Sequence, residues 1–139
     1  MIYEIMNRAK AHHASGEVNS PTTAIISITD KGDKPNTFFP QEWIIDIHHS
    51  QFNDVIKNRP HALTAQQAKE IADFVIEHYN EVDRLIIQCE FGQSRSAGVA
   101  AAICEFFEGH DNGITSDPAY LPNWHCYHLV LDALKAYKN

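Results

Sequence analysis

Residues 84–109 read RLIIQCEFGQSRSAGVAAAICEFFEG, and this stretch decides the fold. Its first five residues, RLIIQ, are centred on a short apolar run, which is typical of a strand covered on both faces. Residues 96–108 carry apolar side chains at helical spacing, and Gly109 follows as a helix stop. Residues 89–95 must therefore turn the chain from a buried strand into a helix within a short loop.

Similar patterns extend along the rest of the chain. Further strands are predicted where apolar and β-branched residues stand between turn-forming ones, at residues 1–6, 22–28 and 42–48. Further helices are predicted from apolar periodicity, at residues 7–14, 64–79 and 123–138. Thr64 and Gln67 make a capping box for the second of these, and Asn123 is the expected N-cap of the third.

Strands that alternate with helices predict an α/β fold. We expect a three-layer sandwich with a mainly parallel central sheet of about four strands, flanked by helices. The length of 139 residues suits one hydrophobic core, so residues 1–139 are expected to form a single domain.

The composition narrows the classes of function. The formal net charge of −7 disfavours nucleic-acid binding, which usually requires a basic face. No signal organisation and no long apolar segment are present, so we expect a cytoplasmic protein without a membrane partner. The three cysteines lack CxxC spacing, which indicates neither a disulfide framework nor a zinc ribbon.

The loop at residues 89–95 has the composition of an anion-binding site. A short loop between a strand and a helix can direct its backbone N–H groups inward, and the helix dipole adds positive potential there. Gly92 permits backbone geometry that a side chain would forbid. Arg95 can grip a phosphate through parallel hydrogen bonds. The same positive potential stabilises the thiolate of Cys89, to which Ser96 can donate a hydrogen bond.

These residues fit a known signature. CEFGQSRS matches the C-x5-R-[ST] motif of cysteine-dependent protein phosphatases, and CxxGxSRSA resembles the dual-specificity branch in particular. The resemblance covers most of residues 23–139. It implies a phosphatase-type phosphate loop between strand 84–88 and helix 96–108. Its substrate-binding residues would be Glu90, Phe91, Gly92, Gln93, Ser94 and Arg95.

The resemblance also implies a mechanism. Cys89 would form a phosphocysteine intermediate, Arg95 would bind the phosphoryl oxygens, and Ser96 would assist the sulfur. An aspartate on a separate loop would protonate the leaving oxygen and then activate water. The residue before the cysteine is Gln88 where the family usually has histidine, so thiolate stabilisation depends more on the loop amides, Arg95 and Ser96.

Two aspartates are candidates for the general acid. Asp46 is favoured because the strand predicted at residues 42–48 would end beside it, and strand ends face the ligand edge of such a sheet. Asp54 has the more usual separation from Cys89 for the family, but it lies inside a predicted loop.

The sequence therefore predicts hydrolysis of phosphate monoesters, on protein phosphotyrosine and also on phosphoserine or phosphothreonine. Phosphate, sulfate or vanadate is expected to bind in the loop, and neither a metal nor an organic cofactor is needed, because the loop and Arg95 supply the positive charge. Two alternatives stay open. The chain could be a phosphate-recognition module without turnover, or it could apply the same chemistry to a small-molecule, nucleotide or RNA 5′ phosphate.

Overall fold

The computed structural model describes residues 1–137, which form a four-stranded parallel sheet and its covering helices. The strands are β1 (Ile2–Met6), β2 (Thr23–Thr29), β3 (Ile44–Gln51) and β4 (Arg84–Gln88). They lie in the order β1-β4-β2-β3, and every adjacent pair is parallel. The helices are α1 (Arg8–Ala14), α2 (Ala65–His78), α3 (Arg95–Glu108) and α4 (Trp124–Lys135), with a short 3-10 helix η1 (Ile114–Ser116) before α4.

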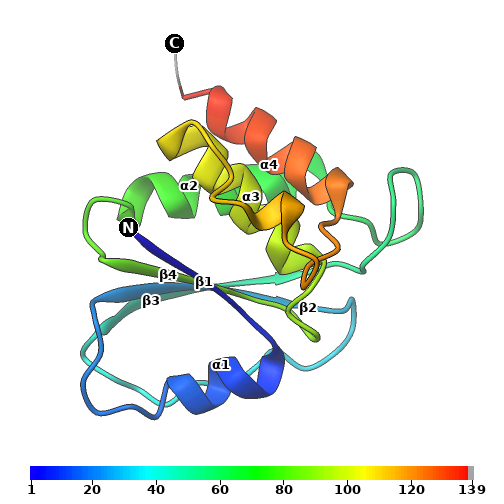
Figure 1. The fold of residues 1–139 in the computed structure, drawn as a ribbon. Helices are drawn as coiled ribbons and strands as arrows, with labels where there is room; N and C mark the ends of the chain where they lie inside the picture. Colours follow the sequence, from blue (N-terminus) through cyan, green and yellow to red (C-terminus); the bar gives the residue numbers. More distant parts are fainter. Residues whose placement is uncertain (138–139) are drawn as a thin grey trace.

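The sheet is the middle of three layers (Figure 1). Helices α2, α3 and α4 cover one face, and α1 covers the other. Alternate residues of the central strands supply the two cores: Ile26 and Ile87 pack under α2, α3 and α4, whereas Ile25 and Ile86 face α1. All residues of β2 and β4 are buried, which confirms the interpretation of their apolar runs as strands covered on both faces.

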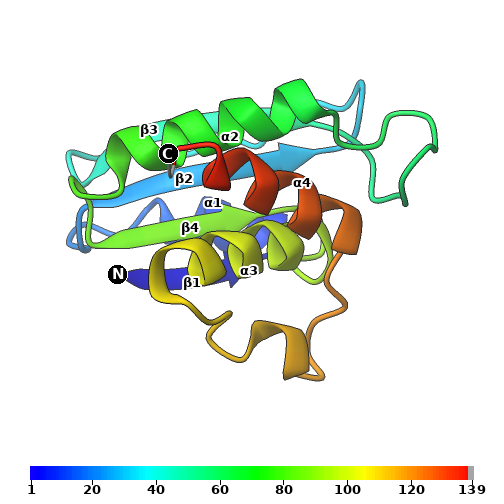
Figure 2. The same ribbon diagram turned by 90° about the horizontal axis from the view of Figure 1, so that it is seen from above.

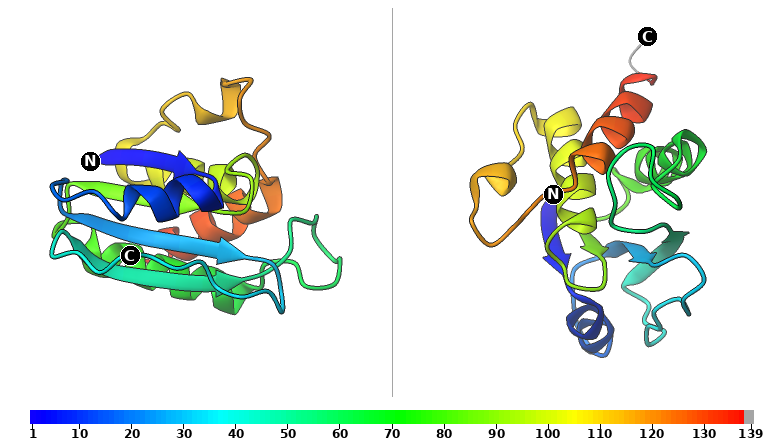
Figure 3. Two further views of the ribbon diagram at one scale, coloured as in Figure 1. Left: turned by 90° about the horizontal axis from the view of Figure 1, so that it is seen from below. Right: turned by 90° about the vertical axis from the view of Figure 1, so that its right-hand side faces the viewer.

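The carboxyl ends of the strands meet at one edge, because all four strands are parallel. Figure 2 and the right-hand view of Figure 3 show the loops after β2, β3 and β4 along this edge, with the segment after β3 reaching beyond the sheet. Since β4 lies between β1 and β2, the loop that follows it occupies the middle of the edge.

The helix ends follow the predicted signals. The Thr64 hydroxyl accepts a hydrogen bond from the Gln67 N–H, and the Gln67 side chain accepts one from the Thr64 N–H, which confirms the capping box. Gly109 ends α3 in the left-handed conformation, and the Asn123 side chain caps α4. The predicted last helix covers residues 123–138, and its position 138 lies outside the described residues. The predicted domain covers residues 1–139, and its positions 138 and 139 lie outside them.

The prediction for the third strand is wrong at its carboxyl end. The sequence pattern ends the strand at residue 48, but β3 continues to Gln51 through two histidines and a serine. β3 is an edge strand with several exposed positions, so it does not need the apolar run that marked the central strands. Asp46 therefore lies near the beginning of β3 and not at its end.

No helix formed by residues 1–137 combines the length and the apolar character that crossing a membrane requires.

Candidate active site

Cys89 lies at the centre of the carboxyl edge, directly after β4. Its backbone N–H donates to the Met6 carbonyl at the end of β1 over 3.3 Å, which continues the sheet by one residue. The residue is 2% exposed, and its Sγ lies 3.1 Å from the Ser96 Oγ. The end of β4 thus places the Cys89 thiol in a buried position beside the Ser96 hydroxyl on the first turn of α3.

The loop that follows Cys89 directs carbonyl groups outward. The Gln93 carbonyl accepts a hydrogen bond from the Leu121 N–H (2.9 Å), and the Ser94 carbonyl accepts one from the Asn123 N–H (3.0 Å). Within the described part of the chain, the N–H groups of residues 90–94 donate to no backbone acceptor. This is the arrangement of an anion-binding nest, in which N–H groups stay free for a ligand.

Gly92 is required by the packing of this loop. Its φ of +66° lies in the left-handed region, and a Cβ placed on it would come within 2.5 Å of the Asn7 nitrogen. The loop is therefore pressed against the junction of β1 and α1, where a side chain has no room.

Arg95, the first residue of α3, is held from two neighbouring strand ends. Its Nη1 donates to the Asp30 carboxylate after β2 (2.7 Å) and to the Phe52 carbonyl after β3 (2.8 Å). The side chain is only 4% exposed, and its Nε is buried without an acceptor in the described residues. A buried charged donor without a partner is costly, so this Nε indicates a position where an anion would be bound.

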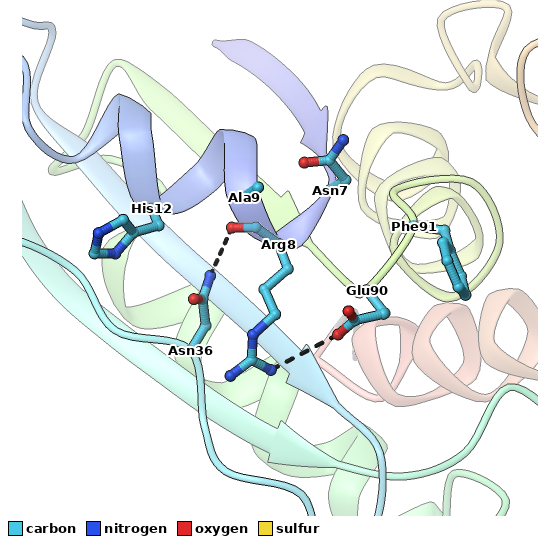
Figure 4. A pocket seen from close by; sticks show the side chains of 7 residues that line it. All are labelled: Asn7, Arg8, Ala9, His12, Asn36, Glu90 and Phe91. Atoms are coloured by element: carbon cyan, nitrogen blue, oxygen red, sulfur yellow. Dashed lines mark hydrogen bonds and ion pairs between the residues drawn. The ribbon is translucent and has the colours of Figure 1, made fainter.

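The opposite side of the loop faces α1 across a cavity of about 500 Å³. Figure 4 shows the Glu90 carboxylate directed toward Arg8, with which it makes an ion pair of 3.7 Å, while the exposed Phe91 side chain points away. Asn36 donates to the Arg8 carbonyl and anchors the beginning of α1. The carboxylate beside Cys89 is thus engaged by a cation.

The structure does not bring Asp46 to Cys89. Asp46 lies opposite Ala24 in β2, which in turn lies opposite Leu85, and Leu85 precedes Cys89 by four residues along β4. Standard strand dimensions then separate the two residues by about 13 Å along the strands and about 10 Å across them, or about 16 Å in all. Asp46 instead hydrogen-bonds to His78 of α2 over 3.0 Å. The strand register therefore gives no support to Asp46 as the general acid, because β3 does not end beside it.

Asp54, the alternative candidate, contacts the phosphate loop. Its Oδ1 accepts hydrogen bonds from the Ser94 hydroxyl and from the Asn123 side chain, both over 2.8 Å. The residue is exposed and lies in the segment after β3. The carboxyl edge thus gathers Cys89, Arg95, Ser96 and Asp54.

Gln88, at the end of β4, is fully buried. Its Oε1 accepts a hydrogen bond from the Ser27 hydroxyl (2.5 Å), and its Nε2 has no acceptor in the described residues. The amide thus links β4 to β2 directly beneath Cys89 and carries no ionisable group there.

The other two cysteines are buried side chains of the helices, Cys104 in α3 and Cys126 in α4. Burial raises the pKa of the Cys104 thiol to about 12, with a further contribution from the charge of Glu108. Burial also raises the pKa of the Cys126 thiol to about 12, and the negative charge of Asp54 raises this pKa further. Both side chains therefore remain protonated thiols at neutral pH.

Sequence reasoning missed two residues that organise the site. Asp30 directly follows β2 and could have been found with the same rule that selected Asp46, since it ends a fully buried strand. Asn123 was recognised only as a helix cap, but its side chain also donates to Asp54, and its carbonyl oxygen lies 2.4 Å from the position of a Cβ placed on Gly98. No local pattern predicts the second role. Among residues 1–137, no group of three or more His, Cys, Asp or Glu side chains is placed to hold a metal ion.

Comparisons with known proteins agree with this geometry at the level of the fold. No protein-family model matches the chain, and none of the curated proteins matches it in sequence. Among solved structures, human DUSP28 superposes with a TM-score of 0.65 at 12% identity, covering 98% of this chain and 93% of that one.

Two further structures are similar. A mouse protein provisionally described as a dual specificity phosphatase, complexed with zinc tungstate, gives a TM-score of 0.63 at 14% identity over 95% of this chain and 83% of that one. Tk-PTP in its active form gives 0.57 at 14% identity over 96% and 90%. The chain therefore has the fold of the dual-specificity and tyrosine phosphatases, as its resemblance to them predicts.

Proposed function

We propose that the chain hydrolyses phosphate monoesters, with protein phosphotyrosine as the leading substrate and phosphoserine or phosphothreonine as further ones. The observation that carries the proposal is the buried Nε of Arg95, which has no acceptor among residues 1–137. Arg95 directly follows the loop that surrounds the Cys89 thiol, and the next residue, Ser96, contacts that thiol. A phosphoryl oxygen is the partner that such a donor fits. The fold shared with phosphatases, and the tungstate bound by one of them, support the same assignment.

In the first step, the Cys89 thiolate attacks phosphorus, so that an S–P bond forms while the bond from phosphorus to the leaving oxygen breaks. Arg95 and the free N–H groups of the loop bind the phosphoryl oxygens and stabilise the charge that develops on them. Asp54 donates a proton to the leaving oxygen, and the alcohol or phenol departs. Asp54 takes this role because it contacts the loop through Ser94, whereas Asp46 is remote.

In the second step, water attacks the phosphocysteine. The ionised Asp54 accepts a proton from this water, a new P–O bond forms, and the S–P bond breaks to release inorganic phosphate. The sulfur leaves as a thiolate, to which the Ser96 hydroxyl can donate over the present 3.1 Å. Because Gln88 carries no ionisable group, this thiolate depends on Ser96, Arg95 and the loop N–H groups.

The test is phosphate release from 4-nitrophenyl phosphate in the presence of a chelator and a thiol reductant. We expect turnover by the wild type, inhibition by vanadate and no turnover by Cys89→Ser. The matched control is Cys104→Ser, a buried cysteine on the adjoining helix, which should keep its activity. Turnover by Cys89→Ser equal to that of the wild type would overturn the proposal.

Alkylation gives an independent readout of the nucleophile. Since the pKa values of Cys104 and Cys126 are raised to about 12 by burial, iodoacetate should modify Cys89 first at neutral pH. Saturating phosphate should protect it. First modification of either buried cysteine, by peptide mapping, would contradict the assignment.

A further inference from the structure

Beside the phosphate loop lies a groove whose lining, apart from Asp54 and Ser94, takes no part in the mechanism. It lies between residues 54–57 and one face of α4, has a volume of about 760 Å³ and begins at Asp54 and Ser94. These two residues belong to the carboxyl edge around Cys89. When a phosphate group is bound in the loop, the part of the molecule next to that phosphate would therefore lie at the entrance of the groove.

Both walls of the groove are fixed. The Asn123 side chain donates to the Val55 carbonyl over 3.2 Å, and the His125 Nε2 lies 2.8 Å from the Leu63 carbonyl. These contacts join the segment after β3 to the first turn of α4 at two points. The groove is therefore formed before any ligand arrives, which reduces the entropic cost of binding.

The length of the groove fits a short extended peptide. Its α4 wall runs from Trp124 to Asp132, which corresponds to about 12 Å at the helical rise per residue. An extended chain advances about 3.3–3.6 Å per residue, so three to four peptide residues span this wall.

The lining has an apolar part formed by Ile56 and Trp124, with Lys57 next to Ile56, and it has the carboxylate of Asp132 farther along α4. Ile56 is 68% exposed and Trp124 is 51% exposed, which are large apolar surfaces to leave in water. Asp132 lies eight residues after Trp124 on α4 and is exposed. It lines the end of the groove that is farthest from the N-terminus of this helix. A peptide that fits this lining would carry an apolar side chain near the phosphorylated residue, against Ile56 and Trp124. It would carry a basic side chain farther away, beside Asp132.

We propose that this groove holds the segment of a phosphoprotein substrate next to the phosphorylated residue. A large apolar side chain one or two residues away packs against Ile56 and Trp124, and a basic side chain three or four residues away pairs with Asp132. The proposal rests on the proposed function, because it takes the phosphorylated residue to be bound at the loop of Cys89.

The experiment measures binding of phosphotyrosine peptides to Cys89→Ser by calorimetry, so that turnover does not interfere. The peptides carry Leu or Ala near the phosphotyrosine and Lys or Glu farther out, on either side in separate sets. In one set, replacing Leu by Ala should weaken binding about tenfold. Adding Trp124→Ala should remove the preference for Leu, and adding Asp132→Lys should reverse the preference for Lys over Glu.

The matched control is Phe39→Ala. Phe39 is 49% exposed, like Trp124, but it packs against His12 of α1 on the opposite side of the sheet. In the Cys89→Ser background it should leave both preferences intact. Equal binding of all peptides, a Leu preference that survives Trp124→Ala, or no binding of any peptide would each overturn the groove proposal.

The failure of the groove can be told apart from failure of the proposed function. Peptide preferences with no phosphate release by the wild type would support the groove and refute hydrolysis. Release of phosphate from 4-nitrophenyl phosphate without any peptide preference would support hydrolysis and refute the groove.

Discussion

Replacing Asp54 by asparagine tests the assignment of the general acid. The Asp54 Oδ1 accepts hydrogen bonds from Ser94 and Asn123, both over 2.8 Å, and the amide oxygen of asparagine can accept both. The contacts that join this segment to the phosphate loop and to α4 are thus retained. The loss of one negative charge at an exposed position should change the free energy of unfolding by less than about 1 kcal/mol. What the variant loses is the proton that the mechanism requires.

The size of the effect should depend on the leaving group. General acid catalysis contributes about 100-fold to 10,000-fold, so Asp54→Asn should slow hydrolysis of phosphotyrosine peptides by about 100-fold or more. A nitrophenolate leaves without a proton, so 4-nitrophenyl phosphate should be slowed by less than about tenfold. The assay compares kcat for the two substrates in wild type and variant, with chelator and reductant present.

The control variant is Asp46→Asn. Because strand geometry places Asp46 about 16 Å from Cys89, its replacement should leave the ratio of the two kcat values unchanged. If Asp46→Asn selectively slows the poorer leaving group and Asp54→Asn does not, the reasoning from strand register is refuted.

Two further predictions concern stability. Gly92→Ala should lower the free energy of unfolding in urea by more than Gly32→Ala does, because both have positive φ but only at Gly92 does a new Cβ meet backbone atoms; equal losses would contradict this. For His78, burial lowers the pKa, but hydrogen bonds to Glu81 and Asp46 outweigh it, so the folded-state pKa is raised. The stabilisation that protonated His78 adds to the free energy of unfolding is thus fully present below the unfolded pKa of about 6.5. It is lost as the pH rises through the folded-state pKa. The excess stability of the wild type over His78→Gln should accordingly shrink between about pH 6 and pH 8, and growth over that range would refute the ion pairs.

The features that sequence reasoning predicted are those that neighbouring residues specify. The capping box of Thr64 and Gln67 depends on residues three apart, and the burial of β2 and β4 follows from continuous apolar runs. The loop around Cys89 belongs to the same group, since the thiol, Gly92 and Arg95 are fixed by one strand-to-helix turn.

The features that it missed depend on which strands are neighbours. Arg95 is held by Asp30 and by the Phe52 carbonyl only because the order β1-β4-β2-β3 places the ends of β2 and β3 on one side of β4. The misplacement of Asp46 has a different origin. An edge strand can continue through polar residues, so hydrophobicity does not mark where β3 ends.

The charges around the loop explain how a chain of net charge −7 could bind a dianion. The nearby carboxylates are each engaged: Glu90 by Arg8, Asp30 by Arg95, and Asp54 by the Ser94 hydroxyl. In the part of the chain that the structure describes, the loop N–H groups and the buried Arg95 Nε are left without an acceptor, and their effect is local. A phosphoprotein presents one dianion to these donors, and basic residues elsewhere on it are attracted by the net negative charge of the chain. A nucleic acid presents phosphates along its whole length, and the net charge repels them. This balance of charges therefore supports the proposed phosphoprotein substrate over the alternative of an RNA 5′ end.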